Sequence, residues 1–163
     1  MDLLPCILAT GIGATLCVDA WALLRERALG VPRPDWGLVG RWIAHMRTGR
    51  FVHASIAKAS PVRGERAIGW VAHYLIGIAF AGLLVLVAGA AWCREPRVLP
   101  ALCVGIGTVL APFLLMQPGM GAGLAARKTP RPSMARMHSL LTHAVFGVGL
   151  YAAGAIAAVL FAP

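Results

Sequence analysis

The chain has 163 residues, 59% of them hydrophobic and 13% charged, and a mean hydropathy of +0.76. A soluble domain of this length needs more polar surface than this composition supplies, so a water-soluble globular protein is excluded. The formal net charge of +9 would suit a nucleic-acid-binding protein, but the basic residues adjoin long apolar segments and no recognition motif accompanies them. The composition therefore predicts a membrane protein that binds no nucleic acid.

Four apolar segments organise the chain. Each has about 19 to 24 residues with little or no formal charge, enough for a helix to cross a hydrocarbon core about 30 Å thick. We expect an all-α, polytopic four-helix bundle that forms a single transmembrane domain over residues 1–163, because the later connections are too short for a second domain. The predicted spans are residues 3–24, 68–92, 99–117 and 134–161, the last beginning six residues before its apolar stretch of 140–161, and residues 25–67 form the first loop.

The basic residues are distributed unevenly among the loops. Of the fifteen Lys and Arg residues, nine lie in the first loop, four in the third and two in the second. The positive-inside rule then places the first and third loops in the cytoplasm and both termini outside. The basic loops would also contact the anionic headgroups of membrane lipids.

The first loop is long enough to hold a helix of its own. After a Pro-Arg-Pro sequence, Asp35 can cap a short helix whose apolar residues share one face, with Arg41 and His45 lying elsewhere. We interpret this segment as an amphipathic helix in the cytoplasmic membrane interface, between the first and second spans. Its apolar face consists of Leu38, Val39, Trp42, Ile43 and Met46.

Four polar side chains interrupt the apolar segments near the cytoplasmic side: Asp19, His73, Gln117 and His143. Ionisable groups inside a membrane are costly and therefore indicate a functional site. The three ionisable ones lie six or seven residues inside the nearest cytoplasmic arginine, a depth of about 9 to 10 Å. Small residues recur at four-residue spacing on the same helix faces, which predicts that these faces meet other helices. We therefore expect a polar pocket open to the cytoplasm.

Three kinds of chemistry fit this polar layer. Asp19 and a histidine could act as a coupled acid–base pair, which makes Asp19, His73 and His143 the candidate catalytic residues. The same three side chains could instead ligate iron(II) or zinc, or the two histidines could ligate a b-type haem. The third alternative is a hydrogen-bond cluster that only fixes helix packing. The sequence leaves the identity of any cofactor open.

The candidate ligand-binding residues surround the cytoplasmic end of this layer. Arg63 and Arg66 precede the second span and Arg127 follows the third, so their guanidinium groups could attract an anion. Gln117 would orient the ligand, and Tyr74 lies beside the second-span histidine. The pattern favours a protein that binds, converts or carries an amphipathic, anionic small molecule.

The third span ends in an unusual sequence. Pro112 should kink the helix, and Pro118 should stop or break it. Gly119, Gly121 and Gly123 could then expose backbone N–H groups as an anion-binding nest, although a plain helix exit is the favoured interpretation.

The four cysteines divide by depth. Cys6, Cys93 and Cys103 map to the outer end of the bundle, where a disulfide is chemically permitted, whereas Cys17 lies deeper. The sequence contains no Cys-x-x-Cys motif, so thiol–disulfide catalysis is not expected.

Several short motifs carry a resemblance to a known family. They are Gly11–Thr15, Asp19–Leu24, Gly40-Arg41-Trp42, Gly64-Glu65-Arg66 with Gly69-Trp70 and His73-Tyr74, and Met116–Gly121. In this order they resemble the bacterial membrane-protein family known as domain of unknown function 2938. The resemblance covers most of the chain and implies a small, multi-pass protein of the bacterial inner membrane. It implies no particular activity.

A small-molecule site is the favoured functional hypothesis, because several intramembrane ionisable groups exceed what packing alone needs. A metal- or haem-binding membrane protein is one alternative. A structural or accessory subunit without its own activity is the other. An oligomer or a complex with a partner subunit is compatible with all three.

Overall fold

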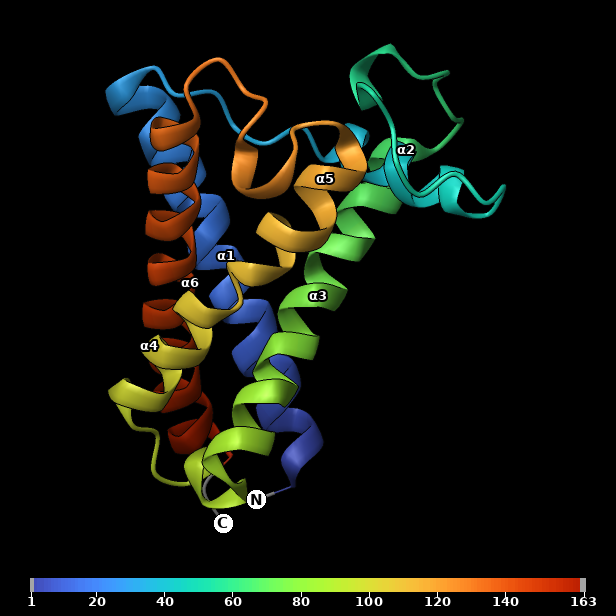
Figure 1. Ribbon diagram of the computed structural model, residues 1–163. Coiled ribbons are helices and arrows are strands. Elements are labelled where there is room, and N and C mark those ends of the chain that lie inside the picture. Colours follow the sequence, from blue (N-terminus) through green and yellow to red (C-terminus); the bar gives the residue numbers. More distant parts are fainter. Residues whose placement is uncertain (1, 162–163) are drawn as a thin grey trace. The chain divides into compact units, whose positions relative to one another are not determined.

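The computed structural model describes residues 2–161, which form helices joined by turns and loops and contain no β-strand. Figure 1 follows the chain from α1 to α6. The predicted all-α fold is confirmed. The elements in chain order are α1 (Leu3–Leu29), α2 (Trp36–Met46), η1 (Ile56–Lys58), α3 (Glu65–Ala88), η2 (Ala90–Cys93), α4 (Val98–Gly107), η3 (Pro112–Met116), α5 (Gln117–Met120), η4 (Leu124–Ala126) and α6 (Pro132–Leu160).

Within the described residues, four helical segments are long and apolar enough to cross a membrane. The chain is therefore a membrane protein, as its composition predicts. The first segment continues past the expected end at residue 24, through two further arginines, to Leu29. The second stops at Ala88, because Gly89 adopts a left-handed φ of 85°. The segments are Leu3–Leu29, Glu65–Ala88, Val98–Met120 and Pro132–Leu160.

The chain divides into two compact units. The first, called the bundle unit here, contains α1, most of α3, α4 and most of α6, from residues 2–33, 74–108 and 141–161. The second, called the loop unit, contains α2, the first two turns of α3 and the end of the third apolar segment, from residues 34–73 and 109–140.

Small residues bring the helices of the bundle unit into backbone contact. A Cβ atom on Gly11 would lie 2.5 Å from the Cα of Ile78 on α3, and one on Gly147 of α6 would lie 3.0 Å from the Cα of Leu102 on α4. The small-residue faces therefore meet other helices, as expected. Alanines and larger side chains together form the core, which contains Ala14, Ala81, Leu84, Trp92, Ala101, Phe146 and Leu150.

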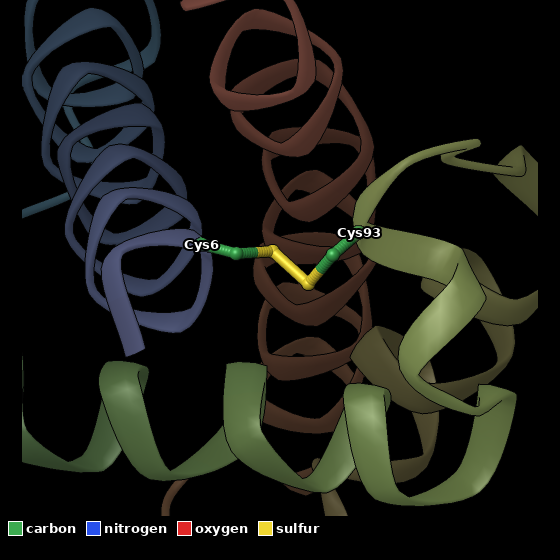
Figure 2. Close-up of a disulfide and its surroundings, with 2 residues drawn as sticks. All are labelled: Cys6 and Cys93. Atoms are coloured by element: carbon green, nitrogen blue, oxygen red, sulfur yellow. A yellow bond between two sulfur atoms is a disulfide. The ribbon is translucent and has the colours of Figure 1, made fainter. Parts of the chain in front are cut away.

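A disulfide closes one end of the bundle unit. Cys6, on the second turn of α1, is bonded to Cys93 in η2, directly after α3 (Figure 2). Both cysteines are fully buried, whereas Cys103 and Cys17 are exposed and unbonded. Beside the disulfide, the buried indole of Trp92 donates a hydrogen bond to the carbonyl of Arg97 at 3.1 Å. The disulfide therefore joins the start of the first apolar helix to the end of the second.

The third apolar segment is not one continuous α-helix. After α4 and a turn, Pro112 begins the π-helical turn η3, and the α-helical turn α5 follows without a break. The expectation that Pro118 stops the helix is wrong, since Pro118 lies in the first turn of α5, where proline is tolerated. The helix ends at Gly121, which has a φ of 98°. The N–H of Ala122 then bonds to the carbonyl of Gln117 at 2.8 Å, as in a helix C-cap.

Candidate functional site

Asp19 and Tyr74 form a hydrogen-bonded pair in the bundle unit. The phenol of Tyr74 on α3 donates to Oδ2 of Asp19 on α1 at 2.9 Å, and both side chains are half-buried. The pair lies next to the closest approach of the two helices, where a Cβ on Gly77 would overlap the hydroxyl of Thr15. Thr15 directs its own proton to the carbonyl of Gly11 at 2.7 Å. Small residues thus bring a carboxylate and a phenol together inside apolar helices.

His143 on α6 is held by Thr108, directly after α4. The Thr108 hydroxyl lies 2.6 Å from the carbonyl of Gly105, which can only accept, so the hydroxyl proton is directed there. Thr108 must then accept a hydrogen bond from Nδ1 of His143, at 2.9 Å. The neutral imidazole is therefore protonated at Nδ1, and its Nε2 is an acceptor. Nε2 is therefore the nitrogen of His143 at which a proton could be taken up.

His73 and Gln117 belong to the loop unit. The ring of His73 stacks on the indole of Trp36, with centroids 3.8 Å apart and an angle of 24° between the planes. Trp70 approaches the same imidazole edge-on at 5.8 Å. Oε1 of Gln117 is buried without a hydrogen-bond partner among the described residues. It is an acceptor without a donor.

The structure thus pairs two of the predicted site residues, Asp19 and Tyr74. Because the remaining polar groups are divided between the two units, the convergence of the whole layer on one pocket stays a prediction. The three arginines expected to attract an anion are exposed. They are Arg63, Arg66 and Arg127.

The metal-site alternative gains no ligand cluster. Among residues 2–161, no group of three or more His, Cys, Asp or Glu side chains could hold a metal ion. A zinc or facial-triad iron site needs three such ligands. Asp19, His73 and His143 are divided between the two units, so they stay a predicted ligand set.

An ion pair that the sequence reasoning missed joins α2 to the start of α3. The guanidinium of Arg41 binds the carboxylate of Glu65 in a bidentate manner, with Nε–Oε2 and Nη2–Oε1 distances of 2.8 and 2.7 Å. The remaining nitrogen of Arg41 approaches the carbonyls of Ile56 and Ala59 at 3.3 and 3.1 Å. Glu65 also accepts from the N–H of Val62 and raises the pKa of Arg41 above its usual value. This pair fixes the loop between α2 and α3.

The two helices cross at glycines beside this ion pair. A Cβ on Gly40 would overlap the carbonyl oxygen of Glu65, and a Cβ on Gly69 would overlap that of Trp36. Only hydrogen atoms fit at these two positions. The close crossing at these glycines places Trp36 of α2 against His73 of α3. The motifs that contain Gly40 and Gly69 thus shape the surroundings of the His73-Tyr74 motif.

Buried histidines hold the other side of α2. His45 and His53 are 9% and 8% exposed, and Nδ1 of His45 lies 2.9 Å from Nε2 of His53. Nε2 of His45 faces the carbonyl of Ser60 at 3.1 Å, and Nδ1 of His53 faces that of Gly119 at 3.4 Å, so each of these ring nitrogens donates to a carbonyl. The sequence pattern places His45 outside the apolar face of α2. In the structure His45 is nevertheless buried, because the loop that follows α2 folds over that side of the helix.

The end of the third apolar segment contacts this helix–loop assembly. The backbone N–H of His53 donates to the carbonyl of Gly119 at 2.8 Å, and a Cβ on Gly119 would lie 2.6 Å from the indole nitrogen of Trp42. The same indole donates to the carbonyl of Phe51 at 2.8 Å. The glycine after Pro118 is thus a packing position rather than part of an anion-binding nest.

One signal in the sequence could have identified these contacts. The first loop contains only three acidic residues, Glu26, Asp35 and Glu65, against nine basic ones. Asp35 is accounted for as a helix cap, which the structure confirms with a 2.8 Å bond from Gly37. Glu65 is the remaining acid at a helix start, and Gly69 follows it four residues later. Together they indicate that the start of this helix is ion-paired and closely packed against another segment.

The fold and these contacts define a membrane protein with four apolar helices and a glycine-packed, ion-paired helix–loop unit. The chain belongs to the family described as "Protein of unknown function (DUF2938)", whose model matches residues 8–157. This confirms the resemblance that the sequence motifs indicate. Neither a curated protein nor a solved structure matches the chain.

Proposed function

We propose that the protein lies in the bacterial inner membrane with its basic loops in the cytoplasm and both termini outside. Thirteen of the fifteen Lys and Arg residues lie in the first and third loops. The Cys6–Cys93 disulfide supports the same orientation independently, because it adjoins the loop with only two basic residues. Disulfides persist in oxidising compartments such as the periplasm.

Reporter fusions test this orientation directly. A reporter that is active only outside the cytoplasm should give a signal after Glu95 and none after Gly30 or Lys128. The reason is the charge bias, which opposes translocation of the two basic loops. An extracytoplasmic signal at Gly30 or Lys128 would contradict the orientation.

We infer that the protein binds, converts or carries an amphipathic, anionic small molecule by proton-coupled chemistry. The observation that carries this inference is the Asp19–Tyr74 hydrogen bond of 2.9 Å inside apolar helices, since an intramembrane carboxylate is costly to retain without a function. Asp19 and one histidine, His73 or His143, would form the acid–base pair. Gln117 would orient the ligand.

The chemistry of this pair follows from its charges. An anion that approaches a carboxylate inside the membrane is repelled unless a proton is taken up by Asp19 or by a histidine near it. Nε2 of His143 is an acceptor in the neutral tautomer and can take such a proton. The exposed arginines Arg63, Arg66 and Arg127 would raise the local concentration of the anion at the cytoplasmic face.

Proton uptake on binding is the measurement that tests this function. Titration calorimetry of the purified protein with dodecyl phosphate, in two buffers of different ionisation enthalpy, gives the number of protons taken up. Asp19→Asn keeps an oxygen that can accept the hydrogen bond from Tyr74, so the fold should stay intact. It removes the negative charge that proton uptake would otherwise have to offset when an anion binds. We expect the wild-type protein to take up about one proton more than Asp19→Asn, whatever the probe itself contributes.

The control is Glu26→Gln, which removes a partly exposed acid that pairs with Arg33 at 2.8 Å. It should take up as many protons as the wild-type protein. Equal proton uptake by Asp19→Asn and the wild-type protein would refute the acid–base role of Asp19.

A second candidate function is that of a structural or accessory subunit. It is favoured by the Arg41–Glu65 ion pair. Both residues belong to the family-like motifs, and they bind each other, which is a structural role. A subunit of this kind would bind no anionic amphiphile, would co-purify with other membrane proteins and would tolerate His73→Ala.

A further inference from the structure

Two buried N–H donors lie one turn apart on α1 and have no acceptor. Nε1 of Trp21 and Nε of Arg25 are both buried, and neither has a hydrogen-bond partner among the described residues. Their spacing of four residues places them next to each other on one helix face. Indole and guanidinium groups only donate, so neither can satisfy the other.

Arg25 differs from an arginine that reaches from a helix end into water. The residue is only 7% exposed, whereas Arg27, two residues later, is exposed. Snorkelling of a long basic side chain would leave the guanidinium in solvent. In Arg25 the Nε is instead buried, on the packed face of α1 that also contains Ala14 and Ala22.

Acidic residues nearby do not neutralise this cation. Arg25 forms no ion pair in the part of the chain that the structure describes. Glu26, the adjacent acid, binds Arg33 at 2.8 Å instead. A largely buried arginine with an unsatisfied Nε and no counter-ion is unfavourable, so its retention indicates that a ligand supplies the negative charge.

We propose that Trp21 and Arg25 form a binding site for the anionic headgroup, a phosphate or carboxylate, of an amphipathic ligand. The guanidinium would bind two headgroup oxygens, and the indole would donate to a third acceptor one turn deeper. Cys17, one turn before Trp21 on this helix face, is exposed and can lie against the ligand's hydrocarbon chain. This assignment rests on the proposed function for the amphipathic class of the ligand, but its residues are independent of the Asp19 pair.

The test compares the thermal unfolding of purified wild-type and variant proteins in a neutral detergent, with dodecyl phosphate or inorganic phosphate added. Arg25→Met removes the cation with little change in volume, and Arg27→Met is its matched control. Dodecyl phosphate should raise the Tm of the wild-type protein and of Arg27→Met. It should leave the Tm of Arg25→Met unchanged, and Trp21→Phe should need a several-fold higher concentration for the same rise.

The unfolding temperatures of the ligand-free proteins distinguish a ligand-binding arginine from one that only stabilises the fold. Because Arg25 is an uncompensated charge without its ligand, Arg25→Met should be at least as stable as the wild-type protein. A Tm of ligand-free Arg25→Met clearly below that of Arg27→Met would overturn the proposal. Arg25→Lys keeps a charge but loses the planar fork, and should bind about tenfold more weakly with an intact fold.

The outcomes separate the two proposals. If Arg25→Met or Arg25→Lys binds dodecyl phosphate as tightly as the wild-type protein, the headgroup site is wrong and the proposed function stands. If inorganic phosphate binds through Arg25 but dodecyl phosphate does not, the anion site stands and the amphipathic ligand class is wrong. If the wild-type protein binds neither probe, both are wrong.

Discussion

Gly69→Ala is expected to cost about 3 kcal/mol or more of folding free energy, because the added Cβ would overlap a main-chain carbonyl. The atom that it meets is the carbonyl oxygen of Trp36. A flexible side chain could move aside, but Trp36 begins α2 and stacks on His73, and the neighbouring Arg41–Glu65 pair ties the same two helices together. Separating the helices would therefore disturb all three contacts. Thermal unfolding of the purified protein, followed by near-ultraviolet circular dichroism, measures the loss.

Gly82→Ala is the matched control in the same helix. A Cβ at Gly82 would meet only a methyl group of Ile7, at 3.9 Å, which is an ordinary contact. Alanine lowers the entropy of the unfolded chain, so this variant should be neutral or more stable by about 0.5–1 kcal/mol. If Gly69→Ala unfolds at the same temperature as Gly82→Ala, the close crossing of α2 and α3 is wrong.

The apolar helices were accessible to sequence reasoning because membrane spans are specified by local composition. A run of about twenty apolar residues has one stable solution in a bilayer, a helix with its backbone hydrogen bonds internally satisfied. The cap at Asp35 is equally local, since its carboxylate bonds to an N–H two residues later. Neither feature depends on knowing which distant residue is near.

The loop unit shows where that reasoning fails. Arg41 and Glu65 are 24 residues apart, and the periodicity of neither helix indicates that they meet. A search for apolar faces leaves His45 off the apolar face of α2, yet His45 is buried against the imidazole of His53. The predicted face consists of Leu38, Val39, Trp42, Ile43 and Met46. Buried polar groups that satisfy each other leave no hydrophobic pattern in the sequence.

The exit of the third apolar segment illustrates a second reason. The expectation that Pro118 ends the helix comes from the missing N–H of proline and its clash with the preceding turn. Both penalties are avoided in the first turn after the π-helical turn that begins at Pro112, so the helix continues to Met120. The effect of one proline on the chain thus depends on another, six residues earlier.

Removing the disulfide is expected to cost about 2–5 kcal/mol, with the lower part of that range favoured for a membrane protein. Cys6 and Cys93 are 87 residues apart, so the bond closes a long loop that contains α2 and α3. The entropic gain is largest when the unfolded chain is a flexible coil, but apolar helices persist in detergent after tertiary contacts are lost, which reduces it. Cys6→Ser with Cys93→Ser, and separately the reduced wild-type protein, should both unfold at a lower temperature than the oxidised protein.

Cys103→Ser is the control for this prediction, since Cys103 is exposed and unbonded. It should leave the unfolding temperature and the mobility on a non-reducing gel unchanged, whereas loss of the Cys6–Cys93 bond should slow migration by opening the loop. The same gel bears on orientation. Protein made in cells without a periplasmic thiol oxidant should accumulate in the reduced form if this end of the bundle unit faces the periplasm. Oxidation that is unaffected by loss of that oxidant would contradict both the periplasmic placement of the disulfide and the charge-based orientation.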